Sequence, residues 1–205
     1  MTRHAVVFEI GNVLIVWDRR LLYREFFDDD AELDRFLNEV YTVEANERFD
    51  KGQPLREFTA TLAKEFPHYA VEIDALNTRW IETLGPIIEG SVLLARQLRE
   101  RGVEVYALSN FADETFKLVE ADVQYSFFRD FDGLVISGRE GIVKPEPAIY
   151  RLLLGRYGLD GPSTVFFDDM VRNVDAALAC GLDALVFESP SLARRQLVER
   201  GLLPG

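Results

Sequence analysis

The chain has 205 residues, of which 48% are hydrophobic and 12% aromatic, so it can bury the core of one domain with a sizeable insertion or of two small domains. Its formal net charge of −12 argues against a nucleic-acid or anionic-membrane partner, and no apolar run reaches the roughly 18 residues of a membrane-spanning helix. A single cysteine excludes an internal disulfide, and the N-terminal segment lacks the features of a secretory signal, so we expect a cytoplasmic protein.

Five short apolar runs alternate with helical segments along the chain. They cover residues 4–10, 103–109, 133–137, 163–169 and 183–188 and are rich in β-branched and aromatic residues. This alternation is typical of a parallel sheet, and the nearly continuous apolar character of the runs predicts strands covered on both faces. The sequence therefore predicts an α/β fold with a doubly wound, Rossmann-like sheet.

The segment between the first two runs is about ninety residues long, against roughly thirty for a simple crossover. It carries apolar residues at helical spacing in two stretches: Leu33, Phe36, Leu37, Val40 and Tyr41, then Leu55, Phe58, Leu62 and Phe66. We predict that residues 17–84 form a helical cap inserted after the first strand, with a return hinge at Gly85-Pro86. Residues 1–16 and 85–205 then form the catalytic core.

The chemistry is expected beyond the carboxyl ends of the strands, where ligands of open parallel sheets bind. The segments that end there supply acids, a glycine, a hydroxyl, an amide and a lysine: Glu9, Gly11, Ser109, Asn110, Lys144, Asp168 and Asp169. Carboxylates gathered at one place repel one another unless a hard cation lies among them, and Mg²⁺ beside a lysine and a hydroxyl suits a phosphoryl group. These residues predict a magnesium site for a phosphorylated ligand.

Four segments resemble, in order, the four motifs of the haloacid dehalogenase superfamily of hydrolases: "VVFEIGNVL", "YALSN", "GIVKPEPAIY" and "TVFFDDMVRNVDAA". The inserted helical segment is similar to the cap of the first subfamily, and the first motif is similar to that of a branch with small sugar-phosphate phosphatases. The resemblance covers residues 6–186. It implies a Mg²⁺-dependent phosphatase that acts on a small phosphorylated metabolite through a phosphoenzyme intermediate.

The resemblance also implies a role for each motif residue. Ser109 and Asn110 would hold phosphate oxygens, and Lys144 would neutralise the charge of the nucleophile and the phosphoryl group. Asp168 and Asp169 would bind Mg²⁺. The substrate is the only partner implied, and both a monomer and a homodimer stay open.

The first motif departs from the family pattern at two positions. Its leading acid, the nucleophile and a metal ligand, is Glu9 here in place of aspartate, and Gly11, which would offer its backbone carbonyl to Mg²⁺, stands where many members have an acid/base aspartate. The extra methylene of glutamate displaces the carboxylate by ~1.3 Å, and misplacement of about 1 Å costs on the order of 10²-fold in rate. We therefore expect an impaired phosphatase, with the proton supplied by water, another residue or the substrate.

Two alternatives to a phosphatase remain. A non-catalytic member of the same fold that binds a ligand is kept open by Glu9. A metal-independent 2-haloacid dehalogenase is the other, and the carboxylate pair Asp168-Asp169 counts against it, because those enzymes need no metal.

Overall fold

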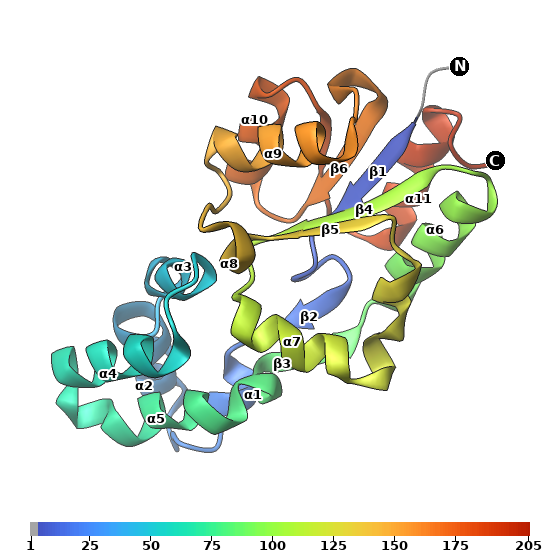
Figure 1. Cartoon of the computed structure of the whole chain (residues 1–205). Helices are drawn as coiled ribbons and strands as arrows, with labels where there is room; N and C mark the ends of the chain where they lie inside the picture. The colour runs from blue at the N-terminus through green and yellow to red at the C-terminus, as the bar shows by residue number, and fades with distance from the viewer. Residues whose placement is uncertain (1–3) are drawn as a thin grey trace.

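A computed structural model describes residues 4–205, so residues 1–3 of the predicted core segment lie outside the described residues. The central feature is a five-stranded parallel sheet in the order β5-β4-β1-β6-β7 (Figure 1). Its strands in chain order are β1 (Ala5–Phe8), β4 (Glu104–Ser109), β5 (Gly133–Ile136), β6 (Thr164–Asp168) and β7 (Asp183–Val186). Each lies within one of the five predicted runs, so the α/β class with a parallel sheet is confirmed.

Helices cover both faces of the sheet. One face carries α6 (Glu89–Glu100), α7 (Asp113–Ala121) and α11 (Pro190–Glu199), and the other carries α9 (Pro147–Tyr157) and α10 (Val171–Ala179) (Figure 1). In β1, Val6 and Phe8 join the first of these cores while Ala5 and Val7 join the second, because successive side chains of a strand point to opposite faces. This explains why the strand is apolar throughout.

The remaining core elements are short. They are α8 (Ser137–Glu140) and 3₁₀ segments at Val123–Asp130 and Gly161–Ser163. Among residues 4–205, none of the helices combines the length and the apolar character needed to cross a membrane.

A helical lobe lies between the first and second strands of the sheet in chain order. It contains α1 (Arg20–Tyr23), α2 (Asp30–Arg35), a π-helical turn (Phe36–Val40), α3 (Val43–Asp50), α4 (Leu55–Glu65), a 3₁₀ turn (Pro67–Tyr69), α5 (Ala70–Arg79) and a 3₁₀ turn (Trp80–Thr83). The apolar residues predicted to line these helices are buried, except Phe66, which is half-buried just beyond α4. The lobe sits beside the sheet, with α3 facing its edge (Figure 1).

A two-stranded antiparallel ribbon, not predicted from the sequence, joins the lobe to the core. It pairs β2 (Ile15–Trp17) with β3 (Leu84–Ile87). The expected hinge residues Gly85 and Pro86 lie inside β3, and both are residue types that weaken strands, so the local sequence gave no strand signal. The boundaries we predicted for the cap fall within this ribbon.

Local capping explains where the site-facing helices begin. The Thr42 hydroxyl accepts a hydrogen bond from the Ala45 amide at the start of α3, and Pro147 occupies the first turn of α9. These signals set the residues at which α3 and α9 begin.

Candidate active site

The side chains of four predicted site residues meet at the carboxyl edge of the sheet. Glu9 follows β1, Ser109 ends β4 and Asp168 ends β6, while Lys144 reaches in from the loop before α9. All four are buried, with Glu9 the most exposed at 6%. They converge because β1 is paired in register with both β4 and β6, which brings the ends of these strands together.

Both oxygens of the Glu9 carboxylate are bound by protein groups. Oε1 accepts hydrogen bonds from Ser109 Oγ at 2.6 Å and from the Gly11 amide at 3.1 Å. Oε2 forms an ion pair with Lys144 Nζ. The longer glutamate arm therefore reaches the hydroxyl and the ammonium directly.

The Lys144 ammonium lies between two carboxylates. Besides Glu9 it contacts Asp168 Oδ2 at 2.5 Å, and it donates to the Leu108 carbonyl at 3.0 Å. Burial lowers the pKa of Lys144, and the neighbouring Asp168 charge opposes that shift. The Asn110 side chain fixes the lysine backbone, donating to its carbonyl at 2.9 Å and accepting from its amide at 2.7 Å.

The two carboxylates after β6 have different surroundings. Asp168 Oδ1 accepts from the Met170 amide and from Asn173 Nδ2, each at 2.9 Å. Asp169 is only half-buried and accepts from Asn12 Nδ2 at 3.2 Å. Burial, followed by the charge of Asp168, raises the pKa of Asp169, so this carboxylate lacks a full compensating charge.

The predicted magnesium ligands do not form a ready-made cage. Within residues 4–205, no group of three or more His, Cys, Asp or Glu side chains is placed to hold a metal ion. The Lys144 ammonium lies between Glu9 and Asp168 and forms ion pairs with both carboxylates.

The donor chemistry nevertheless fits Mg²⁺. Asp169 lines the cavity, and its negative charge is not fully balanced by neighbouring positive groups. Asn173 Oδ1 is a buried oxygen in the same cavity wall and has no hydrogen-bond partner among the described residues. Carboxylate and amide oxygens are ligands that hard divalent cations accept. Residues on this side of Lys144 can therefore contribute to a metal site.

A cavity of about 240 Å³ lies between this edge of the sheet and the helical lobe. Glu9, Gly11, Lys144 and Asp169 line it from the core. The lobe contributes five lining residues: Val43, Asn46, Glu47, Asp50 and Trp80. The site is thus enclosed by two parts of the chain that are far apart in sequence.

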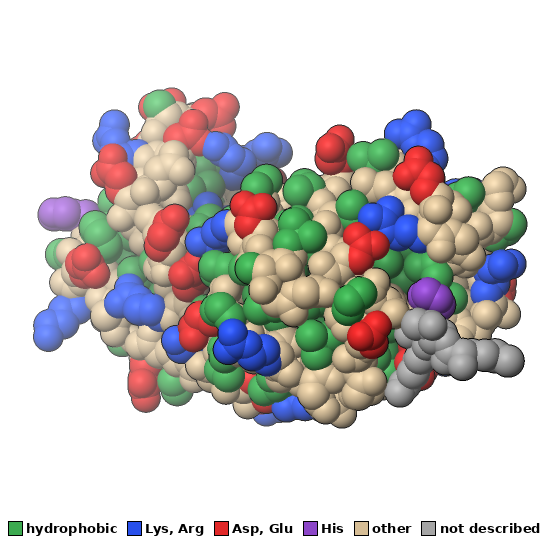
Figure 2. Space-filling view, turned by 90° about the horizontal axis from the view of Figure 1, so that it is seen from above, with side chains coloured by type: hydrophobic (Ala, Val, Ile, Leu, Met, Phe, Trp, Pro, Cys, Tyr) green, Lys and Arg blue, Asp and Glu red, His purple; other side chains and the backbone are tan. Residues whose placement is uncertain are grey.

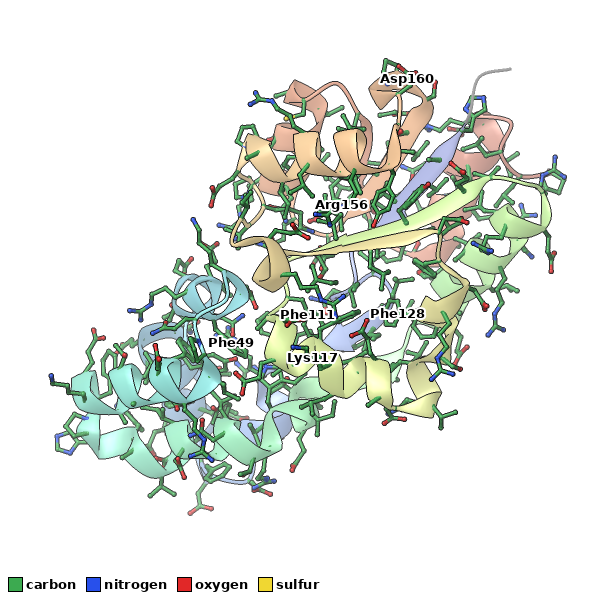
Figure 3. All side chains as sticks on the ribbon, in the orientation of Figure 1. Phe49, Phe111, Lys117, Phe128, Arg156 and Asp160 are labelled. Atoms are coloured by element: carbon green, nitrogen blue, oxygen red, sulfur yellow. The ribbon has the colours of Figure 1, made fainter. Side chains whose placement is uncertain are left out.

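Contacts between α3 and the core close the cavity. Ser137 Oγ donates to the Asp50 carbonyl at 2.6 Å, and the ion pair Arg172–Glu47 spans 2.6 Å. Trp80 also packs on Phe111 with ring centroids 5.3 Å apart, and Figure 3 shows Phe111 where the core meets the lobe. The ion pair is partly exposed, so it contributes at most about 1 kcal/mol to closure.

Several cavity residues were not singled out in the sequence. Asn173 lies in the fourth of the segments that resemble the family motifs, and it donates to Asp168 from the first turn of α10. Asn12 could have been noticed because it follows Gly11 directly, and its backbone is left-handed with φ 57°. Asp50 and Trp80 had no such signal, because only the packing of the lobe brings them to the site.

Comparison with known proteins agrees with this architecture. The family model for haloacid dehalogenase-like hydrolases matches residues 4–181. The sesquiterpene phosphatase astK of Aspergillus oryzae is 28% identical over 90% of this chain and 89% of its own length. Phosphatase MT3486 of Mycobacterium tuberculosis is 24% identical over 97% of this chain and 93% of its own length.

A solved structure shares the fold. The haloacid dehalogenase family enzyme bt-2542 of Bacteroides thetaiotaomicron, in complex with magnesium and inorganic phosphate, superposes with a TM-score of 0.72 at 25% identity, covering 91% of this chain and 95% of that one. Both curated relatives are named phosphatases, in agreement with the phosphatase branch that the first motif resembles. The ordered motifs, the parallel sheet and the family match together show that the chain belongs to the haloacid dehalogenase-like hydrolase family.

Proposed function

We propose that this hydrolase is a Mg²⁺-dependent phosphatase of a small phosphorylated metabolite that works through a phosphoenzyme intermediate at Glu9. The observation that carries the proposal is the meeting of Glu9 with Ser109, Lys144 and Asp168 at the strand ends. The phosphatase names of two relatives and the magnesium and phosphate bound to the Bacteroides enzyme support it.

In the proposed reaction, a Glu9 oxygen attacks phosphorus and the bond from phosphorus to the substrate's ester oxygen breaks. The alcohol leaves with a proton, and water then attacks the acyl phosphate, releasing inorganic phosphate and restoring Glu9. Ser109 Oγ and the Asn110 backbone N–H hold phosphate oxygens, and Lys144 balances the negative charge of the nucleophile and the phosphoryl group.

The proposed metal ligands are Glu9, the Gly11 carbonyl, Asp168 and Asp169. When bound, Mg²⁺ supplies positive charge that polarises the phosphoryl group. A bound cation would stabilise the ionised Asp169 carboxylate, whose pKa is raised by burial and by the charge of Asp168.

A direct test is phosphate release from a generic aryl phosphate, with Mg²⁺ and with a chelator. We expect slow, Mg²⁺-dependent release, abolished in Glu9→Gln, which keeps the side-chain length and removes the charge. Hydroxylamine trapping of an acyl phosphate on Glu9 reports the intermediate. Release that is unaffected by both the chelator and Glu9→Gln would refute the proposal.

Ligand binding without turnover is a second candidate, favoured by one observation. Both Glu9 oxygens are already engaged by protein groups, which restrains the carboxylate from attacking phosphorus. This candidate predicts that inorganic phosphate binds in the presence of Mg²⁺ while no phosphate ester is hydrolysed, even by Glu9→Asp.

The setting proposed for this activity is the cytoplasm, with the protein acting as a monomer or a homodimer. Its net charge of −12 supports a small-molecule substrate over nucleic acid or an anionic membrane.

A further inference from the structure

The cavity above Glu9 has a polar end and an apolar remainder. Beyond the residues proposed to hold the phosphate, most of its surface is apolar. Eight apolar residues line it: Ile10, Ile15, Trp17, Val43, Trp80, Leu84, Phe111 and Met170. Four of them, Trp17, Val43, Trp80 and Leu84, belong to residues 17–84, the part of the chain that lies over the site.

The polar side chains in this part of the wall are already paired with protein groups. Asn46 accepts from the Tyr41 hydroxyl at 2.7 Å and donates to Asp50 at 2.8 Å. Asn12 accepts from the Trp17 amide at 3.0 Å and donates to Asp169. A ligand with many hydroxyl groups would have to break these bonds, which costs affinity because each broken bond leaves a partner unsatisfied.

The charges of the wall argue against a second anionic group on the ligand. Among the described lining residues the cations are Lys144, bound to Glu9 and Asp168, and Arg172, bound to Glu47. The lobe side of the cavity instead presents the carboxylate of Glu47. A second phosphate or a carboxylate on the ligand would meet no cation on this wall that is not already in an ion pair.

We propose that the substrate is the phosphate monoester of an uncharged, apolar alcohol with an aromatic or branched hydrocarbon skeleton. This inference rests on the proposed phosphatase function and names its substrate class. The phosphate lies at Glu9 and Lys144, and the hydrocarbon packs on Trp17, Val43 and Trp80. Each methylene buried there strengthens binding about fourfold, until the cavity is filled.

Titration calorimetry with non-hydrolysable phosphonates tests this substrate class without requiring turnover. The probes, all with Mg²⁺, are inorganic phosphate, methyl, butyl and naphthyl phosphonate, and a sugar phosphonate. We expect affinity to rise from methyl to naphthyl phosphonate, with an increasingly negative heat-capacity change, and the sugar phosphonate to bind no better than the methyl compound.

The outcomes separate this inference from the proposed function. If inorganic phosphate and methyl phosphonate bind but affinity does not grow with apolar size, or the sugar phosphonate binds tightest, the apolar substrate class is wrong and the phosphatase proposal survives. If neither inorganic phosphate nor any phosphonate binds, both are overturned.

Two valines on the lobe provide matched variants. Val43 is half-buried in the cavity wall, whereas Val71 on α5 is 72% exposed and is not among the lining residues. Val43→Asn should weaken naphthyl phosphonate binding by about tenfold and leave methyl phosphonate binding unchanged, since it removes apolar contact and adds a polar group. Val71→Asn should change neither.

Met170→Gln, a second variant of similar side-chain size on the core side of the cavity, should have the same selective effect. It keeps the inference testable if Val43→Asn fails to fold, which a thermal melt reports. Equal losses for naphthyl and methyl phosphonate in both variants would overturn the apolar packing.

Discussion

At the scale of single residues, Lys144 balances the charge of the site. Its buried ammonium contacts Glu9 and Asp168, two carboxylates that are themselves 6% and 0% exposed. Buried charges of like sign are tolerated only when an opposite charge or a metal compensates them. The stability of this edge of the sheet therefore depends on one lysine.

Replacing Lys144 by methionine should destabilise the protein by about 3–5 kcal/mol at neutral pH, because it leaves buried carboxylates without their partner. Urea denaturation measures this. Lys117→Met is the matched control: Lys117 is exposed on α7, where Figure 3 labels it, and its ion pair with Asp113 is a surface pair worth about 0.5 kcal/mol. Equal effects of the two substitutions would contradict the assigned role of Lys144.

Glu9 is expected to limit the phosphatase rate of this chain, because its carboxylate stands on a longer side chain than that of aspartate. Glu9→Asp shortens the arm and should raise kcat/KM by roughly 10²-fold if positioning is the defect. A steady-state assay with Mg²⁺ and an aryl phosphate measures it, and Glu65→Asp at the exposed end of α4 controls for the same change elsewhere. If Glu9→Asp binds Mg²⁺ but gains no activity, the missing acid/base at Gly11 is the better explanation.

At the scale of elements, α3 connects the lobe to the catalytic edge. Its residue Asp50 lines the cavity, its carboxylate is held by Asn46, and its backbone carbonyl receives the Ser137 hydroxyl. Burial raises the pKa of Asp50 well above its ordinary value, although the hydrogen bond from Asn46 opposes this. The helix thus carries a carboxyl group that folding favours in its protonated form.

This pKa shift predicts a pH dependence of stability. A carboxyl whose pKa is higher in the folded than in the unfolded state binds more protons when folded, so stability falls as pH rises from the unfolded pKa to the folded one. Asp50→Asn removes this loss, so the stability of the variant should increase relative to that of the unmodified chain as the pH rises from 4 to 8. Urea denaturation across that range measures it.

The exposed Asp28 supplies the control, because Asp28→Asn makes the same substitution away from the cavity. Its stability difference from the natural chain should stay nearly constant over the range. A parallel pH dependence for Asp28→Asn and Asp50→Asn would show that net charge, rather than burial of Asp50, is responsible.

At the scale of the whole molecule, the helical lobe and the core enclose the cavity at the strand ends. Figure 2 shows acidic and basic side chains mixed over one face of the protein. The lobe is held to the core partly by ion pairs that stay accessible to solvent, such as Lys51–Glu146 at 2.8 Å. Such solvent-accessible pairs are individually weak, so each contributes little to holding the lobe on the core.

Mg²⁺ should stabilise the whole fold if it binds as proposed. A ligand specific to the folded state adds about 2.7 kcal/mol at a hundred times its Kd, so the thermal midpoint should rise with Mg²⁺ concentration. Asp169→Asn should abolish this rise, whereas Asp175→Asn, at an exposed position on α10, should leave it intact. A midpoint that does not respond to Mg²⁺, together with no heat of binding, would contradict the metal site.

The sequence by itself determined the sheet and the family. The strands β1, β4, β5, β6 and β7 lie in runs whose apolar character reflects burial on both faces, which is a local property. The convergence of Glu9, Ser109 and Asp168 followed from one rule, that parallel strands end at the same edge, and Lys144 joins them from the loop before α9. The pattern of apolar runs and the order of the motifs were enough here, because both can be recognised in short stretches of chain.

Tertiary structure alone decided how these residues are paired. That the Lys144 ammonium contacts both Glu9 and Asp168 depends on side-chain packing across three separate segments. The β2–β3 ribbon joins stretches far apart in the chain, and Asp50 and Trp80 reach the cavity only through the packing of the lobe. No local pattern encodes such contacts, because their free energy comes from partners that are distant in sequence and meet only when the chain folds.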